Sequence, residues 1–113
     1  MAAEAYAGSA SITTTEYSCP NASTTLTPIT VDGTYQVFLD TSDMVAGDEL
    51  QIRIYEKVQS GGTQRIVYQS NLVGAQSPPM FVMPALVLLH AWDVTLDCIA
   101  GTSITIDWSI RTP

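Results

Sequence analysis

The chain has 113 residues, of which 46% are hydrophobic and only 13% are charged. This length suits one domain with one hydrophobic core and leaves no room for a second. Four basic residues against 11 acidic ones give a formal net charge of −7, which disfavours binding to nucleic-acid phosphates and to anionic membranes.

The first nine residues are mostly small and show no hydrophobic periodicity. We therefore expect residues 1–9 to form a flexible N-terminal arm and residues 10–113 to form a single domain. The arm also lacks the basic start and apolar run of a signal peptide, so we expect no export by that route.

Alternating β-branched and aromatic residues predict a series of short strands after the arm. The first runs from Ile12 to Cys19 and ends at a turn, and the second runs from Leu26 to Val31. Pro28 confines the second to the edge of a sheet. A third strand is expected from Tyr35 to Leu39.

The clearest alternation lies between residues 50 and 58. It places four apolar side chains on one face, namely Leu50, Ile52, Ile54 and Val58. Gly61 and Gly62 then allow a tight turn, and residues 65–72 are predicted to return as the paired strand of a hairpin.

Two more alternating runs close the chain. The inward side chains of the first are Trp92, Val94, Leu96 and Cys98, and those of the second are Ile104, Ile106, Trp108 and Ile110. The turn at residues 100–103 predicts that they pair as a second hairpin. With no amphipathic helix between strands, the sequence predicts an all-β fold, an antiparallel jelly-roll-like β-sandwich of six to eight strands.

Residues 77–89 are unusual because both phases of the alternation are apolar. Something must cover the second face of such a strand. A strand buried inside the domain and an oligomer interface explain the pattern equally well. The residues of the candidate assembly interface are Met80, Phe81, Met83 and Leu86.

Catalytic groupings are not evident. His90 is the single histidine, and we expect a half-buried structural imidazole because no G-x-S-x-G turn or other nucleophile setting accompanies it. Asp93, Asp97 and Asp107 lie on two strands that are predicted to pair, but we expect solvated carboxylates there and not a glycosidase pair. We predict that the protein is not an enzyme.

No cofactor or metal is predicted, although one loop is acidic. Its four acids are Asp40, Asp43, Asp48 and Glu49. Their spacing does not match an EF-hand, so capping of turns is favoured over calcium binding, which stays open.

The cysteines and tryptophans are expected inside the domain. Cys19 and Cys98 lack C-x-x-C spacing, and buried free thiols are favoured over a disulfide. Trp92 and Trp108 fall on apolar phases, which favours the core over a sugar-stacking platform. The glycosylation pattern at Asn21 has no meaning without export.

Residues 33–111 resemble the small β-sandwich decoration or cement proteins of tailed-phage capsids. The likeness lies in a short Thr/Ser-rich chain with few charges, the turn at residues 46–50 that leads into an alternating strand, and the alternating end of the chain at residues 100–111. The resemblance implies a non-enzymatic virion protein that sits on a capsid shell, often as a homo-trimer, and that folds in the bacterial cytoplasm. Its partners would be itself and a major capsid protein, without nucleic acid or membrane.

A carbohydrate-binding β-sandwich module is the alternative function. Tyr35, Tyr55 and Tyr68 are the aromatic residues that such a module would use. One observable feature separates the capsid hypothesis from the carbohydrate hypothesis. Glycan binding needs at least two exposed, coplanar aromatic rings on a common surface.

Overall fold

The alternating residues of the chain form nine strands and no helix in residues 2–113, which the computed structural model describes. The strands are β1 (Ala3–Ile12), β2 (Tyr17–Ser18), β3 (Gly33–Asp40), β4 (Glu49–Lys57), β5 (Arg65–Val73), β6 (Met80–Val82), β7 (Leu86–Leu88), β8 (His90–Ala100) and β9 (Ile104–Thr112).

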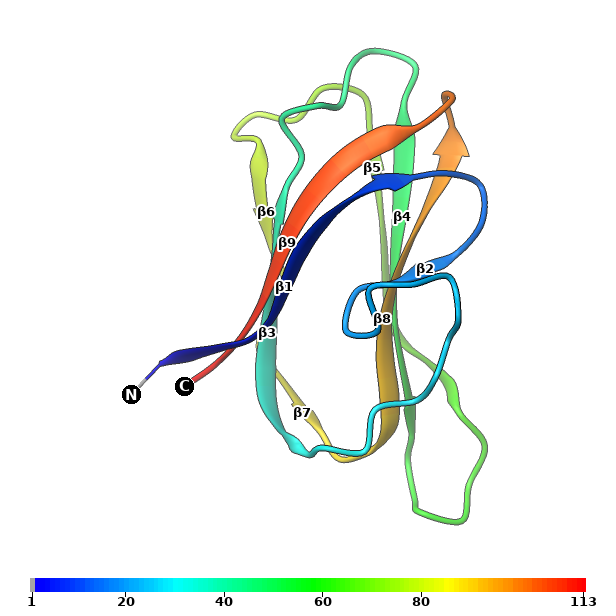
Figure 1. The fold of residues 1–113 in the computed structure, drawn as a ribbon, viewed down its shortest axis with the longest axis vertical. Helices are drawn as coiled ribbons and strands as arrows, with labels where there is room; N and C mark the ends of the chain where they lie inside the picture. Colours follow the sequence, from blue (N-terminus) through cyan, green and yellow to red (C-terminus); the bar gives the residue numbers. More distant parts are fainter. Residues whose placement is uncertain (1) are drawn as a thin grey trace.

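Two antiparallel sheets pack face to face (Figure 1). The first sheet has the order β1-β9-β3-β6, with β7 also paired to β3, and lies on the left of the view. The second has the order β2-β8-β4-β5 and lies on the right. The predicted antiparallel β-sandwich is confirmed, with nine strands in place of six to eight.

The hairpin of β4 and β5 matches its prediction closely. Leu50, Ile52 and Ile54 are buried, as their alternation requires. Val58 departs from the prediction because β4 ends at Lys57, and the Val58 side chain is 85% exposed in the turn.

The predicted second hairpin is wrong, because β8 and β9 belong to different sheets. β8 pairs with β2 and β4, whereas β9 pairs with β1 and β3. The turn between them carries the chain from one sheet to the other (Figure 1). Both strands still direct their apolar phase into the core, so a hairpin and a sheet-crossing turn have the same sequence pattern.

The predicted flexible arm is also wrong over residues 3–9. These residues begin β1, which pairs with β9 from Ala3 opposite Thr112 to Ile12 opposite Ile104. The sequence did not predict this strand, because its mostly small side chains give no alternation of hydrophobicity. Met1 lies outside the described residues.

Residues 26–31 form a loop and not the expected strand. Ile29 makes one isolated bridge with Trp92, and the Trp92 indole N–H donates to the Val31 carbonyl at 2.9 Å. Pro28 has no N–H to donate, which explains why no longer ladder forms beside it.

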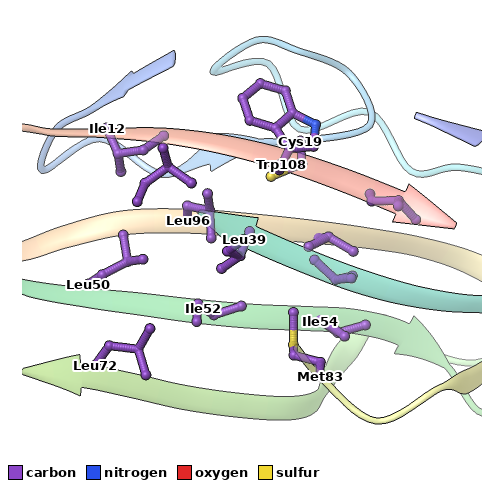
Figure 2. Packing of buried hydrophobic residues seen from close by; sticks show 14 of the residues in the cluster. Ile12, Cys19, Leu39, Leu50, Ile52, Ile54, Leu72, Met83, Leu96 and Trp108 are labelled. Atoms are coloured by element: carbon purple, nitrogen blue, oxygen red, sulfur yellow. The ribbon is translucent and has the colours of Figure 1, made fainter. Parts of the chain in front are cut away.

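The core fills the space between the sheets, and Figure 2 shows side chains of both sheets pointing into it. Trp108 of β9 lies against Gly8 of β1, where an added Cβ would come within 2.6 Å of the indole ring. Tyr17 packs against the same indole at 5.5 Å between ring centroids. A glycine at position 8 therefore lets the ring of Trp108 lie close against β1.

Candidate interaction surface

One edge of the first sheet consists of β6 and β7, which both pair with β3, and the other edge is β1. Pro84 lies between them and has no backbone N–H, so regular pairing stops there. The chain keeps its direction, because the Met83 N–H donates to the Val37 carbonyl at 3.0 Å. β6 and β7 thus form one edge strand that is broken near its middle.

Three of the four predicted interface residues point into the sandwich. Met83 is 1% exposed and belongs to the core, which makes it unavailable to a partner. Phe81 and Leu86 are half-buried and pack against the core. Met80 is 50% exposed and points outward. Whether these residues form an interface stays a prediction.

The outward phase of the broken strand is apolar and open. Val82 and Val87 accompany Met80 in this phase, at 43% and 75% exposed. Of the two explanations left open by the sequence, burial of both phases inside the domain is therefore wrong for the part of the chain that the structure describes. The outer phase is free to contact another molecule.

Phe38 lies near the centre of this outer face. It sits on β3, opposite Val82 of β6 and opposite Ser109 of β9, and residues opposite each other share a face. The Arg111 guanidinium stacks over the Phe38 ring, with 3.9 Å from Cζ to the ring centroid. Its Nε–H donates to Ser109 Oγ at 3.0 Å. These two contacts hold Arg111 flat against the sheet.

Two hollows flank the Phe38–Arg111 pair and share both residues in their walls. The larger, of about 340 Å³, reaches Gln36 and Ala85. The smaller, of about 200 Å³, reaches Met80. Sites for drug-sized ligands span roughly 300–1,000 Å³, so the larger hollow lies at the bottom of that range and the smaller one lies below it.

Charge on this face is sparse and separated along β9. Asp107 lies opposite Asp40 of β3, so two carboxylates occupy one end. The Arg111 backbone lies four residues further along β9, roughly 13 Å at 3.3 Å per residue. It lies opposite Glu4, and its guanidinium reaches over Phe38. The Ser109 hydroxyl donates to Glu4 and accepts from Arg111. The other three basic residues of the chain lie on β4 and β5.

The outer face of the second sheet is polar and is closed by the chain itself. Glu16, from the segment between β1 and β2, accepts hydrogen bonds from the Tyr55 hydroxyl at 2.6 Å and from the Thr95 hydroxyl. The same carboxylate lies 3.7 Å from Nη1 of Arg53. Burial, together with the hydrogen bond to Glu16, raises the pKa of Tyr55.

Asp93 is a buried carboxyl group on this same face, only 2% exposed. Its Oδ1 accepts from Ser18 Oγ at 2.6 Å and from the Val94 N–H at 2.8 Å. Burial nevertheless raises the pKa of Asp93 to about 6. The expectation of a common solvated face is wrong, because Asp97 is half-buried and Asp107 lies on the other sheet.

Three polar groups of the second face have no hydrogen-bond partner within residues 2–113. They are Gln51 Oε1, Arg53 Nε and Asp97 Oδ1, and all are buried. Gln51 lies opposite Asp97, and burial raises the pKa of Asp97 while Arg53 lowers it.

The remaining candidate residues, His90 and the acids of residues 40–49, make structural hydrogen bonds. His90 is half-buried as expected, and its backbone N–H donates to Glu56 at 3.0 Å. The acids of residues 40–49 mainly cap backbone N–H groups, which confirms the turn interpretation. The capping pairs are Asp40 with Ser42, Asp43 with Thr105 and Asp48 with Val45.

The predicted core residues are confirmed. Cys19 and Cys98 are free, buried thiols whose pKa is raised by burial. Trp92 and Trp108 are buried between the sheets.

The three tyrosines of the carbohydrate-binding hypothesis do not share a surface. Tyr35 is buried in the core, and its hydroxyl donates to the Val31 carbonyl at 3.0 Å. Tyr68 packs against the core, and Tyr55 lies in the Glu16 cluster on the opposite side of the second sheet. The aromatic platform expected of a glycan-binding module is therefore not formed by these three residues.

A scan against protein-family models, a search of the curated proteins and a search of the solved structures each found no match. None of residues 2–113 belongs to a helix long and apolar enough to cross a membrane. Over the same residues, no three His, Cys, Asp or Glu side chains gather into a possible metal site.

Phe38, Val82, Val87 and Arg111 were not among the interface residues predicted from the sequence. Sorting residues 80–83 by phase would have separated Met80 and Val82 from Phe81 and Met83. No signal in the sequence predicted the position of Arg111, since its neighbour Phe38 is distant in the chain and meets it only through the pairing of β3 with β9.

Proposed function

We propose that this chain is a non-enzymatic virion structural protein that decorates or cements a phage capsid through protein–protein contacts and is itself a homo-oligomer. One observation carries the proposal. Met80 and Val82 are exposed beside Phe38 on the outer face of the first sheet, and no segment of residues 2–113 covers them. Exposed apolar surface with a polar rim is typical of protein contact sites.

The form of this surface favours a protein partner over a small ligand. It extends along several strands, and both of its hollows are lined by the Phe38–Arg111 pair. Few charges lie on it, so its burial against a protein costs little desolvation. A contact of this kind needs no catalytic residues.

The capsid as partner rests on the resemblance to decoration proteins. The short Thr/Ser-rich chain supports that part of the proposal, and so does the sandwich fold, in which a whole sheet face is presented to the outside.

The test combines sedimentation velocity of the protein with its cosedimentation on tailed-phage capsids that have been stripped of accessory proteins. We expect oligomers at tens of micromolar and binding to the capsids. Met80→Asp should weaken both by about tenfold or more, because it places an unpaired charge in a dry contact. Val58→Asp is the matched control, since Val58 is exposed in the β4–β5 turn.

A wild-type protein that stays monomeric and does not bind capsids would overturn the proposal. Circular dichroism of each variant separates loss of contact from loss of fold.

A further inference from the structure

β1 is the edge strand of the first sheet on the side away from β6 and β7, and it pairs with β9 alone (Figure 1). Within residues 2–113, no backbone hydrogen bond outside this pairing involves residues 3–12. Gly8 is exposed, and because glycine has no side chain, the surface that it exposes is main chain. One backbone edge of β1 is therefore open.

The pairing of the neighbouring strands shows which residues face this open edge. The Val37 carbonyl accepts from the Met83 N–H, so Val37 directs its backbone groups away from β9. Ile110 lies opposite Val37 and therefore directs its own backbone groups to β1, where it bonds to Tyr6. Every second residue after Tyr6 also bonds to β9. The residues between them direct their N–H and C=O groups to the open edge, namely Ala7, Ser9 and Ser11.

The stretch from Tyr6 to Ile12 lacks the features that usually block an edge strand. Natural edges are protected by charged side chains, prolines or bulges. The one irregularity of β1 lies before this stretch, between Glu4 and Tyr6, and the register is regular from Tyr6 onward. The stretch contains no charged residue and no proline, although the whole chain has a net charge of −7. Its backbone is therefore available to a further strand.

We propose that a second copy of this chain adds its β1 to this edge, antiparallel, about a two-fold axis that passes through Ser9 perpendicular to the sheet. Ser9 is the central residue of the stretch, so this register pairs the stretch along its whole length. Ser9 then lies opposite itself, and Ala7 lies opposite Ser11 of the second copy. These residues direct their backbone groups to the edge, so each pair exchanges two hydrogen bonds. The inference rests on the proposed function, because it names one contact between copies in the homo-oligomer.

The side chains of this register favour a second copy as the occupant. Every facing pair joins neutral residues, so an acidic chain meets its own copy here without like charges in contact. The pairs are Tyr6 with Ile12 and Gly8 with Ala10 on the core side, and Ala7 with Ser11 and Ser9 with Ser9 on the outer side. The contact uses the open edge of both copies, so it closes at two. It also leaves both outer faces, with Met80, on one side of a continuous sheet.

Ser9→Cys tests the register, because it places two thiols opposite each other at the axis. Residues of a hydrogen-bonded pair have Cα atoms about 5.5 Å apart, a separation that a disulfide spans. Under mild oxidation, the band on a non-reducing gel should shift to twice the monomer mass. Ala7→Cys is the matched control, since its copy lies four residues away, roughly 13 Å at 3.3 Å per residue, and its band should stay at the monomer mass. Cys19 and Cys98 are buried and should not contribute.

Ser9→Pro tests the backbone contact. It removes an N–H that points to the open edge and spares the pairing with β9, so sedimentation equilibrium should show association weakened by about tenfold or more. Gln69→Pro is its control on β5, the other long edge strand. Tyr68 beside Gln69 bonds to Ile54 of β4, so Gln69 also faces an open edge. Circular dichroism checks that both proline variants are folded.

Cross-linking at position 9 alone, together with weaker association of Ser9→Pro, supports the inference. Equal cross-linking of the two cysteine variants, or association that survives Ser9→Pro, overturns it. Association lost only in Gln69→Pro also overturns it and assigns the contact to β5. Met80→Asp, which tests the outer face, should leave the cross-link of Ser9→Cys intact. A wild-type monomer that still binds capsids overturns the edge contact and keeps the capsid contact of the proposed function.

Discussion

The two outer faces of the sandwich differ in how their polar groups are used. On the second sheet, Glu16 is brought over the face by the chain and accepts hydrogen bonds from Tyr55 and Thr95, beside Arg53. On the first sheet, Asp107 lies opposite Asp40, and the Arg111 guanidinium lies over the Phe38 ring and donates to Ser109.

This difference shows that composition does not identify a contact surface. The second face has more charged residues near its centre, yet its charges are neutralised within the chain. The first face has fewer, and no ion pair forms among them within residues 2–113. The two faces should therefore respond differently to mutation, the second in stability of the fold and the first in association.

Glu16→Ala should have the largest effect on stability. It removes the acceptor of two hydroxyl groups and the ion-pair partner of Arg53, so we expect the free energy of unfolding to fall by about 2–3 kcal/mol. Urea unfolding measures it. Glu4→Ala, on the first face, loses only the bond from Ser109 and should cost under about 1 kcal/mol. Equal losses would contradict the contrast between faces.

Asp93→Asn should change the pH dependence of stability. The pKa of Asp93 is raised from 3.8 to about 6 by burial, so its protonated form fits the fold, and stability is lost as pH rises through that interval. Relative to Asp93→Asn, the wild type should lose on the order of 2 kcal/mol between about pH 4 and pH 7. Parallel unfolding profiles of the two proteins over this range would refute the assignment.

Gly8→Ala should destabilise the first sheet by about 1–2 kcal/mol, because the new methyl group meets the Trp108 ring at 2.6 Å. Thermal unfolding followed by tryptophan fluorescence reports the loss. Gly61→Ala is the control, since no atom lies within 4 Å of its added Cβ. If both variants melt alike, Trp108 does not hold β1 in place.

Asp107→Asn should have the smallest effect on the monomer and the opposite sign. It relieves the facing carboxylate of Asp40, which we expect to raise the free energy of unfolding slightly at low salt. The gain should shrink in high salt. A salt-independent loss of stability would show that Asp107 has a partner within the chain.

The fold class and most of the core were predictable from the sequence. Strict alternation identified β4 and its hairpin partner, and it placed Trp92 and Trp108 correctly inside. It failed at the turn of residues 100–103, because a hairpin and a turn between two sheets have the same sequence pattern. It also failed at residues 3–9, where small side chains show no alternation of hydrophobicity.

The candidate surface was only partly predictable for a similar reason. Residues 80–86 stood out because both phases are apolar, and one of the four predicted interface residues, Met80, is exposed. Met83 was misplaced because a composition argument does not separate the phases of a strand. The Arg111–Phe38 stack depends on strand order, which local sequence does not encode.

The interruption at Pro84 limits how copies of this protein can assemble. A long open edge accepts strand after strand, which leads to fibres. Here that edge offers only two strands of three residues each, with a proline between them. At high concentration, this edge therefore disfavours growth of a fibre by backbone pairing. A closed contact between sheet faces instead stops at a fixed number of subunits. The same proline that breaks a strand protects the protein from polymerising there.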